Sequence, residues 1–576
     1  MQKKIIRRNV EEIQLFSAED LHPLLQRIYS ARGMQSNAEL ERGLTQLLPY
    51  HDLLGIAKAV QCLTDTITKQ KKILIVGDFD ADGATSTAVA VRALRSFGAQ
   101  QVEFLVPNRF AFGYGLTAEL VEVAKKEFSP ALIVTVDNGI ANNAGVAAAK
   151  ALGIKVLVTD HHLPGLMLPD ADVIVNPNQP HDIFPSKNLA GVGVIFYVML
   201  ALRRHLSDSG WFAQQNITEP NMSHLLDLVA LGTVADVVPL DHNNRILVYQ
   251  GLRRIRAGQC IPGISALLEI AGRNQARLVA GDLGFAVAPR LNAAGRLDDM
   301  SLGIECLLTD DPNKAREIAV ILSEMNDERR LIEQDMQEQA MQILTKLQPD
   351  KSVELPMGIC LFDPEWHQGV IGIVAARIKE RFHRPVIAFA LASETEIKGS
   401  ARSIPGLHIR DVLAQISVEY PNLIEKFGGH AMAAGLTLSR DLFHDFAQAF
   451  SKVVSQQLTE EQLHNKLLSD GELNQTDLTL EVAEVLREAG PWGQSFPEPL
   501  FDGAFQVLEQ RLVGNKHLKM VLGRAGLTLD AIAFNIDINQ WPNHRCEHVH
   551  IAYRMDVNEF RGRRTVQLIV EHMEVA

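Results

Sequence analysis

The sequence predicts an α/β protein of several domains, and three patterns along its 576 residues support this. Short apolar runs alternate with helical stretches from about residue 72, a long charged segment keeps helical periodicity, and the C-terminal tail is rich in strands. A chain of this length exceeds what one hydrophobic core can hold. We therefore expect a parallel-sheet domain, a long connecting helix, a second α/β domain and a C-terminal β-barrel.

The first α/β block contains four apolar runs that have the character of buried strands. Continuous apolar strands alternating with helices are typical of a parallel sheet covered on both faces. Right-handed crossovers place the carboxyl ends of such strands along one edge, where these folds build their sites. The expected strands are Ile73–Val76, Val102–Val106, Ala131–Val136 and Lys155–Thr159, and the expected helices are Thr85–Phe97, Leu116–Phe128 and Ala141–Leu152.

The remaining segments predict the other domains. Pro312–Leu347 has no internal proline or glycine, so it predicts one helix about 54 Å long, at about 1.5 Å per residue. One core cannot cover such a helix, so we expect it to connect two domains. A second α/β block follows at about 355–455, and Gly490 opens a glycine-punctuated tail of strands that ends at Ala576.

Composition limits the function classes. The net charge of −13 argues against a non-specific basic coat for DNA, although a local arginine cluster can still bind phosphates. The five cysteines are scattered without a CxxC pair, which excludes the usual cysteine zinc site and a disulfide framework. No apolar run is long enough to span a membrane, and the charged N-terminus lacks the apolar core of a secretory signal. We expect a cytoplasmic protein.

Acidic and imidazole residues follow three of the expected strands. Asp78, Asp80 and Asp82 come after the first strand, Asp137 after the third, and Asp160-His161-His162 after the fourth. Asp236 is a further carboxylate in apolar surroundings, preceded by a helical stretch, Leu225–Leu231. Alternate residues of an extended segment point the same way, so we expect Asp78, Asp80 and Asp82 to face one site.

Carboxylates that lie this close repel one another unless cations stand between them. Aspartate and histidine without thiolate suit Mn²⁺ or Mg²⁺, and two such ions can clamp a phosphoryl group and activate water. A lone aspartate at a strand end is more often a helix cap, and Asp160 fits a structural role that orients a neighbouring imidazole. The conjunction of several acidic strand ends on one edge favours a metal site.

Four segments together resemble the motifs of the DHH phosphoesterase superfamily in the form found in the RecJ family. They are VGDFDADGATST, VTVDNGI, VTDHH and LGTVADVVPL. The resemblance continues through GYGL, APRLNAAGRLDDM, WHQGVIGIVAARIKERF, KGSARS and KFGGHAMAAG to the tail, and so covers nearly the whole chain. It implies a DHH catalytic domain, a DHH-associated domain, and a barrel of the oligonucleotide-binding fold.

The resemblance also implies roles for individual residues. Metal ligands fall on Asp78, Asp80, Asp82, Asp137, His161 and Asp236, which would hold two divalent cations, Mn²⁺ or Mg²⁺. Asp82, His161 and His162 are the catalytic candidates, with His162 placed to touch the scissile phosphate. Asp78 stands where related pyrophosphatases have a histidine, and Ala111-Phe112 replaces the usual acidic residue before Gly113.

Substrate-binding candidates lie in several loops. The expected pocket for the terminal 5′-phosphate consists of Arg109, Ser400 and Arg402, whose donors suit charge-assisted hydrogen bonds. The loop PRLNAAGR is expected to hold the next phosphates through Arg290, Asn292 and Arg296. The glycines of the GGH loop let backbone N–H groups approach a phosphate, which gives Gly428, Gly429 and His430. A surface ion pair, for each arginine, and a simple glycine turn are the plain alternatives.

The barrel is expected to hold a single strand through a basic groove and a stacking aromatic. The candidates are Lys516, His517, Lys519, Phe560 and Arg561-Gly562-Arg563-Arg564, for which a solvated basic edge is the alternative.

The function that the resemblance implies is a processive 5′→3′ exonuclease on single-stranded DNA that releases 5′-mononucleotides and acts in recombination and repair. The alternatives are a DHH-family phosphodiesterase on short oligonucleotides or cyclic dinucleotides, and a non-catalytic scaffold. The first group lacks the long helix and barrel, and the second has lost metal ligands.

Expected partners are single-stranded DNA, single-strand-binding protein and a helicase, and the expected state is a monomer. The expected domains are 1–70 (helical), 71–310 (catalytic), 311–350 (long helix), 351–460 (DHH-associated) and 461–576 (oligonucleotide-binding fold).

Overall fold

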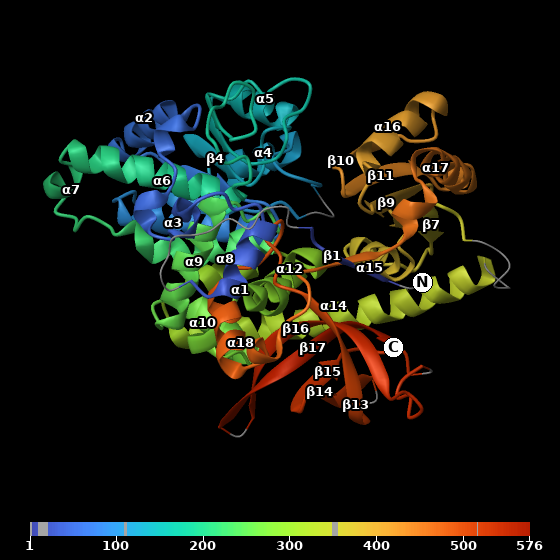
Figure 1. The fold of residues 1–576 in the computed structure, drawn as a ribbon. Coiled ribbons are helices and arrows are strands. Elements are labelled where there is room, and N and C mark those ends of the chain that lie inside the picture. Colours follow the sequence, from blue (N-terminus) through green and yellow to red (C-terminus); the bar gives the residue numbers. More distant parts are fainter. Residues whose placement is uncertain are drawn as a thin grey trace. The chain divides into compact units, whose positions relative to one another are not determined.

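The computed structural model describes residues 3–9, 21–108, 112–347, 355–514, 516–538, 540–560 and 562–576. These residues form two compact units, coloured along the chain in Figure 1. The larger unit comprises Arg7–Asn326 and Ser469–Ala576, and the smaller comprises Asp327–Leu468 with the N-terminal residues up to Ile6.

A five-stranded parallel sheet is the centre of the larger unit. Its order is β3 (Val102–Leu105), β2 (Ile73–Val76), β4 (Leu132–Val136), β5 (Lys155–Thr159) and β6 (Val173–Val175), and every neighbouring pair runs parallel. Successive side chains of a strand point to opposite faces, so an all-apolar strand needs cover on both.

Helices cover both faces of this sheet (Figure 1). Leu74 and Val76 share a core with α4 (Ala118–Glu127) and α5 (Asn143–Ala151). Ile73 and Ile75 belong to the main core, to which the other helices contribute. Those helices include α2 (Ile56–Thr68), α3 (Ala81–Ser96) and α6 (Gly191–Asp208). The parallel sheet predicted from the sequence is therefore confirmed.

The helices after the sheet depart from prediction at two places. The helical stretch expected at Leu225–Leu231 is α8 (Leu226–Ala235), which continues through Gly232 so that Asp236 is its C-cap. The predicted loop PRLNAAGR is wrong, because these residues belong to α12 (Ala288–Leu297), which directly follows a π-helical turn, η6 (Leu283–Val287). Pro289 stands in the first turn of α12, where a proline needs no N–H partner.

The long helix is confirmed as α14 (Pro312–Leu347), with the boundaries predicted from the sequence. In the smaller unit a mixed sheet has the order β10 (Lys426–Gly429), β11 (Ala433–Ser439), β9 (Glu396–Arg402), β8 (Val386–Leu391) and β7 (Ile359–Phe362). Its helices are α15 (Ile371–Phe382), α16 (Ile409–Glu419) and α17 (Phe443–Gln457). This is the second α/β block.

A closed barrel completes the larger unit. The strands β13 (Phe501–Val513), β14 (His517–Arg524), β15 (Leu527–Ala533), β17 (Arg563–Val575) and β16 (His548–Phe560) follow one another around it, which confirms the predicted barrel. Its interior is continuous with the main core. An ion pair between Arg277 and Glu559 and another between Arg256 and Glu488 join the two parts of this unit.

The remaining sequence predictions concern membranes and cysteines. Among the helices described, none combines the length and the apolar character that crossing a bilayer requires. All five cysteines are free, and Cys62, Cys306 and Cys546 are buried. Cys260 and Cys360 are only partly buried.

Candidate active site

The carboxyl ends of neighbouring strands bring the acidic and imidazole groups together. β2, β4 and β5 lie side by side, and Asp236 reaches the same place from the end of α8. The donor atoms form three overlapping groups, within each of which they all lie within 4.8 Å of one another. The groups are Asp137-His161-His162, Asp82-His161-Asp236 and Asp78-Asp80-Asp137, and together we call them the acidic centre.

The first of these segments is not extended as predicted. Asp80 is the N-cap of α3, and its Oδ1 accepts the backbone N–H groups of Asp82 at 2.9 Å and Gly83 at 3.0 Å. Capping free N–H groups starts the helix, so Asp82 lies in its first turn. The three aspartates therefore reach the acidic centre from a strand end, a cap and a helix, which explains why α3 begins before the expected Thr85.

Asp82 is held by a second helix. Its Oδ2 accepts the N–H of Gly191 at 2.6 Å, and its Oδ1 accepts the N–H of Val192 at 3.0 Å. These donors belong to the first turn of α6, where free N–H groups and the helix dipole favour a negative charge. Sequence reasoning missed Gly191 and Val192. Their only indication in the sequence is that an apolar helical run begins with glycines.

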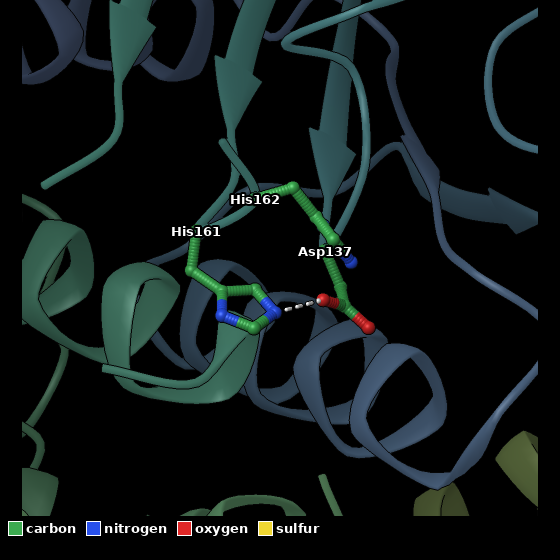
Figure 2. A group of neighbouring side chains, drawn as sticks. All are labelled: Asp137, His161 and His162. Carbon is green, nitrogen blue, oxygen red and sulfur yellow. Dashed lines mark ion pairs between the residues drawn. The ribbon is translucent and has the colours of Figure 1, made fainter. Parts of the chain in front are cut away.

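His161 faces two carboxylates. Its Nε2 pairs with Oδ1 of Asp137 (Figure 2). The distance between these atoms is 3.1 Å, and Oδ2 of Asp236 lies 3.4 Å from the same Nε2. Nε2 of His161 and Oδ1 of Asp137 are both buried, and neither makes a hydrogen bond. Buried polar atoms without partners cost free energy, so the arrangement suits a cation between them. Aspartate and histidine donors without thiolate match Mn²⁺ or Mg²⁺.

The backbone at Asp137 supports the same reading. Asp137 has φ of +62°, a left-handed conformation that is unfavourable for a residue with a side chain and that concentrates at functional sites. Its N–H donates to Thr159 of β5 at 3.1 Å, and its carbonyl accepts from the Tyr114 hydroxyl at 3.2 Å. The neighbouring elements thus fix the direction of the Asp137 carboxylate.

The protonation of the acidic centre follows from burial and repulsion. Burial and the charge of Asp236 raise the pKa of Asp82 to about 7, and burial and Asp80 raise the pKa of Asp236 to about 8. Burial and Asp82 raise the pKa of Asp137 well above its usual value. Burial and the charge of His162 lower the pKa of His161. In the absence of cations the carboxyls of Asp82 and Asp236 take up protons near neutral pH, and bound cations would displace these protons.

His162 has a different partner. Its Nδ1 lies 2.7 Å from Oδ1 of Asp160, whose Oδ2 accepts the N–H of Ile140 at 2.9 Å. Burial opposes the charge of each group, but their pairing raises the pKa of His162 to about 9 and lowers that of Asp160 to about 2. The predicted orienting contact of Asp160 is confirmed. Tyr114, which sequence reasoning missed, has its hydroxyl 3.4 Å from the His162 ring nitrogens.

Helix α12 places its three candidates differently. Asn292 contacts the segment between two members of the acidic centre, since its Oδ1 accepts the N–H of Ala81 at 2.8 Å. Arg290 is only 8% exposed, and its guanidinium donates to the carbonyl of Ala286 at 2.6 Å and to Ser323 Oγ at 3.2 Å. Arg296 is partly exposed near the C-terminus of the same helix. Arg290 therefore supports the fold of this segment through its side chain.

The smaller unit brings Ser400 and Arg402 together. The Arg402 guanidinium donates to Ser400 Oγ at 3.1 Å and to the carbonyl of Ala401 at 2.8 Å. A Cβ on Gly372, in the first turn of α15, would lie 2.8 Å from both side chains. Gly428 and Gly429 end β10, and the N–H of His430 donates to Ala433 at 2.8 Å in the turn to β11. Arg109 and Ala111 lie outside the described residues.

The barrel candidates are divided. Lys516 is exposed, and His517 and Lys519 are partly exposed along β14. Arg564 forms an ion pair with Glu484. Arg561 and the side chain of Phe560 lie outside what the structure describes.

Comparison with protein-family models gives three matches along the chain. The DHH family N-terminal domain matches residues 72–233, the DHHA1 domain matches 355–458, and the RecJ OB domain matches 469–572.

Individual proteins match over almost the full length. The chain is 54% identical to the single-stranded-DNA-specific exonuclease RecJ of Escherichia coli, over 99% of both chains, and 55% identical to that of Salmonella typhimurium, again over 99% of both. The crystal structure of RecJ in complex with Mn²⁺ from Thermus thermophilus is 30% identical, with a TM-score of 0.79. That match covers 99% of this chain and 79% of the other.

Proposed function

The chain belongs to the RecJ family of single-stranded-DNA-specific exonucleases, and we propose that its acidic centre hydrolyses the terminal phosphodiester of single-stranded DNA with two divalent cations, Mn²⁺ or Mg²⁺. The observation that carries the proposal is the buried pair of His161 Nε2 and Asp137 Oδ1, which lie 3.1 Å apart without a hydrogen bond. Crystal structures of RecJ in complex with Mn²⁺ and with Mg²⁺ support the choice of cation.

The ligands for the cations are the residues predicted from the sequence. Bound cations supply an activated water and neutralise the charge that develops on the phosphate. Asp82 is oriented for this role by the N–H groups of Gly191 and Val192. The proposed ligands are Asp78, Asp80, Asp82, Asp137, His161 and Asp236.

His162 contributes a positive charge of its own. Because Asp160 keeps it protonated, its ring can donate a hydrogen bond to a non-bridging phosphate oxygen. Its side chain is 31% exposed, so a substrate can reach it. We assign substrate contacts to Arg296 and Asn292 beside the acidic centre, and to Ser400, Arg402, Gly428, Gly429 and His430 in the smaller unit, with Arg109 as a further candidate.

The exonuclease function is favoured over a phosphodiesterase for short oligonucleotides or cyclic dinucleotides. The relatives from Salmonella typhimurium and Escherichia coli are named as exonucleases, and the match covers 99% of each chain. The matched length therefore includes the long helix and the barrel. We infer 5′→3′ polarity, processive action, 5′-mononucleotide products and a role in recombination and repair as part of the same proposal.

The test is digestion of strands labelled at either end, with Mn²⁺ and with EDTA. Loss of the label as a mononucleotide from the 5′ end at once, and from the 3′ end only late, is expected for single strands and not for blunt duplexes. Asp82→Asn and His161→Ala should remove the activity. Asp170→Asn is the matched control, because Asp170 is an exposed carboxylate paired with Lys150. Activity that persists in Asp82→Asn, or release from the 3′ end first, would contradict the proposal.

The finer statements about domains and partners are also proposals. We divide the chain into residues 1–70, 71–310, 311–350, 351–460 and 461–576, and the family matches at 72–233, 355–458 and 469–572 fall within three of these segments. Single-strand-binding protein and a helicase are the expected partners, and a cytoplasmic monomer is the expected state. Sedimentation of the purified chain tests the monomer, and co-sedimentation with single-strand-binding protein tests that partner.

A further inference from the structure

Phe285 is a large aromatic side chain that is exposed to solvent on η6. It is 82% exposed, compared with 52% for Phe534 and 44% for Tyr114. Burying a phenylalanine stabilises a fold by roughly 1.5–3 kcal/mol, and this position obtains little of that. An aromatic ring kept in water at a structured position suggests a ligand for the ring.

The backbone at Phe285 has an unusual, supported conformation. Phe285 is the middle residue of the π-helical turn η6, a form that is frequent at functional sites. The Arg290 side chain donates to the carbonyl of Ala286 at 2.6 Å and so supports the turn from α12. Gly281 lies on one flank of the ring, where a Cβ would be 3.9 Å from Cδ2 of Phe285.

The turn η6 packs against one element that carries a member of the acidic centre, and the helix after it contacts another. A Cβ on Gly284 would lie 3.2 Å from Cγ1 of Val234, so η6 packs against the end of α8, two residues before Asp236. The helix that follows η6 carries Asn292, which accepts the N–H of Ala81. Val237 is 62% exposed with φ of +61°, which is unusual for a β-branched residue. Val237 is thus a second exposed apolar side chain, and it directly follows Asp236 in the sequence.

We propose that Phe285 stacks against a nucleobase of the single strand while the terminal phosphodiester lies at the acidic centre, with Val237 contacting the same nucleotide or its neighbour. The inference rests on the proposed function and adds a binding residue to it. Every base has a π-face, so a stacking ring grips a strand without reading its sequence. The bases of a duplex are stacked on one another, so the same ring also favours a single strand.

The experiment measures equilibrium binding of a fluorescent single strand in EDTA, where cleavage stops, for the wild-type chain and three variants. Phe285→Ala should raise Kd by at least about fivefold, the lower limit for loss of one base–aromatic stack. Phe285→Trp should stay within twofold of the wild type. Val418→Ala is the matched control, because Val418 is 80% exposed on α16 and should leave Kd unchanged. Melting curves establish that each variant is folded.

Abasic strands make the test specific to stacking. A single abasic nucleotide is moved along the strand, and at one position it should weaken wild-type binding as much as Phe285→Ala does, with no further loss in that variant. A Kd of Phe285→Ala within twofold of the wild type would overturn the inference. Equal abasic penalties in both proteins at every position would overturn it as well. Failure of the wild-type chain to cleave single strands with Mn²⁺ would instead overturn the proposed function.

Discussion

Gly191 donates its backbone N–H to Asp82 over 2.6 Å while its Cα faces Asp137 so closely that a Cβ would lie 2.6 Å from Cβ of Asp137. Gly191 thus affects two carboxylates of the acidic centre. Its N–H binds Asp82, and its lack of a side chain leaves room for Asp137. A methyl group in place of the Gly191 hydrogen would have to displace Asp137, whose direction is fixed by β5 and Tyr114.

Gly191→Ala should therefore lower kcat on single-stranded DNA by at least about tenfold, since small displacements of reacting groups carry large rate penalties. Gly193→Ala is the matched control in the same helix, because the three atoms nearest to its Cβ would all belong to the Leu189 side chain, with Cδ2 closest at 3.0 Å. Steady-state kinetics with Mn²⁺ compare the two, and calorimetry confirms that both fold. Equal kcat values for the two variants would show that Gly191 does not set the position of Asp137.

The elements predicted most accurately were those with uninterrupted patterns. Ile73–Val76 and Lys155–Thr159 form strands with the expected boundaries, and Pro312–Leu347 forms one helix, because no glycine or proline interrupts these runs. α12 was missed because proline and glycine in its sequence suggested a loop. Its Gly295 has a packing reason, since a Cβ there would lie 1.8 Å from the carbonyl oxygen of Phe79.

The side chains of the acidic centre could be predicted, whereas the backbone groups that orient them could not. Aspartate and histidine at strand ends follow from the rule that parallel strands share one edge. The contact between Val192 and Asp82 joins residues 110 positions apart. Its donor is a backbone N–H, which every residue except proline has, so the residue type does not indicate it. The burial of Arg290 and its hydrogen bond to Ala286 could not be predicted either, because burial of an arginine on a helix cannot be read from its local sequence.

The raised pKa values of Asp82 and Asp236, about 7 and about 8, predict how pH affects the metal-free protein. In the unfolded chain the pKa of an aspartate is about 3.9. Between about pH 4 and pH 8 the folded state therefore binds more protons than the unfolded chain, and its free energy of unfolding falls as pH rises. The Tm in EDTA should decrease from pH 5.5 to pH 8, and Mn²⁺ should raise it more at pH 8, where fewer protons compete.

Asp236→Asn isolates this effect from the general charge of the protein. The amide does not titrate, so the dependence of Tm on pH should be shallower in the variant than in the wild type. Parallel Tm profiles for the two proteins in EDTA would mean that Asp236 keeps an ordinary pKa in the folded state.

The two arginines of α12 should respond differently to truncation. Arg290→Ala leaves the buried carbonyl of Ala286 without its donor, which should lower the free energy of unfolding by about 1–3 kcal/mol. Arg296→Ala should leave stability unchanged and weaken DNA binding, with a shallower dependence of Kd on salt. Urea denaturation and salt titrations of Kd measure both. The assignment fails if Arg296→Ala destabilises the fold as much as Arg290→Ala does.

Gly372 offers a way to test the proposed pocket for the terminal phosphate without removing a charge. Alanine at this position would bring a Cβ 2.8 Å from Ser400 Oγ and from the Arg402 guanidinium, although it should favour the helical backbone of α15. If these groups bind a 5′-phosphate, Gly372→Ala should reduce the preference for 5′-phosphorylated over 5′-hydroxyl strands, measured as the ratio of kcat/KM. Gly435→Ala is the control on the same sheet, since its Cβ would approach only the Gly399 carbonyl, at 3.9 Å. An unchanged ratio in Gly372→Ala, with the activity itself retained, would move the phosphate pocket away from Ser400 and Arg402.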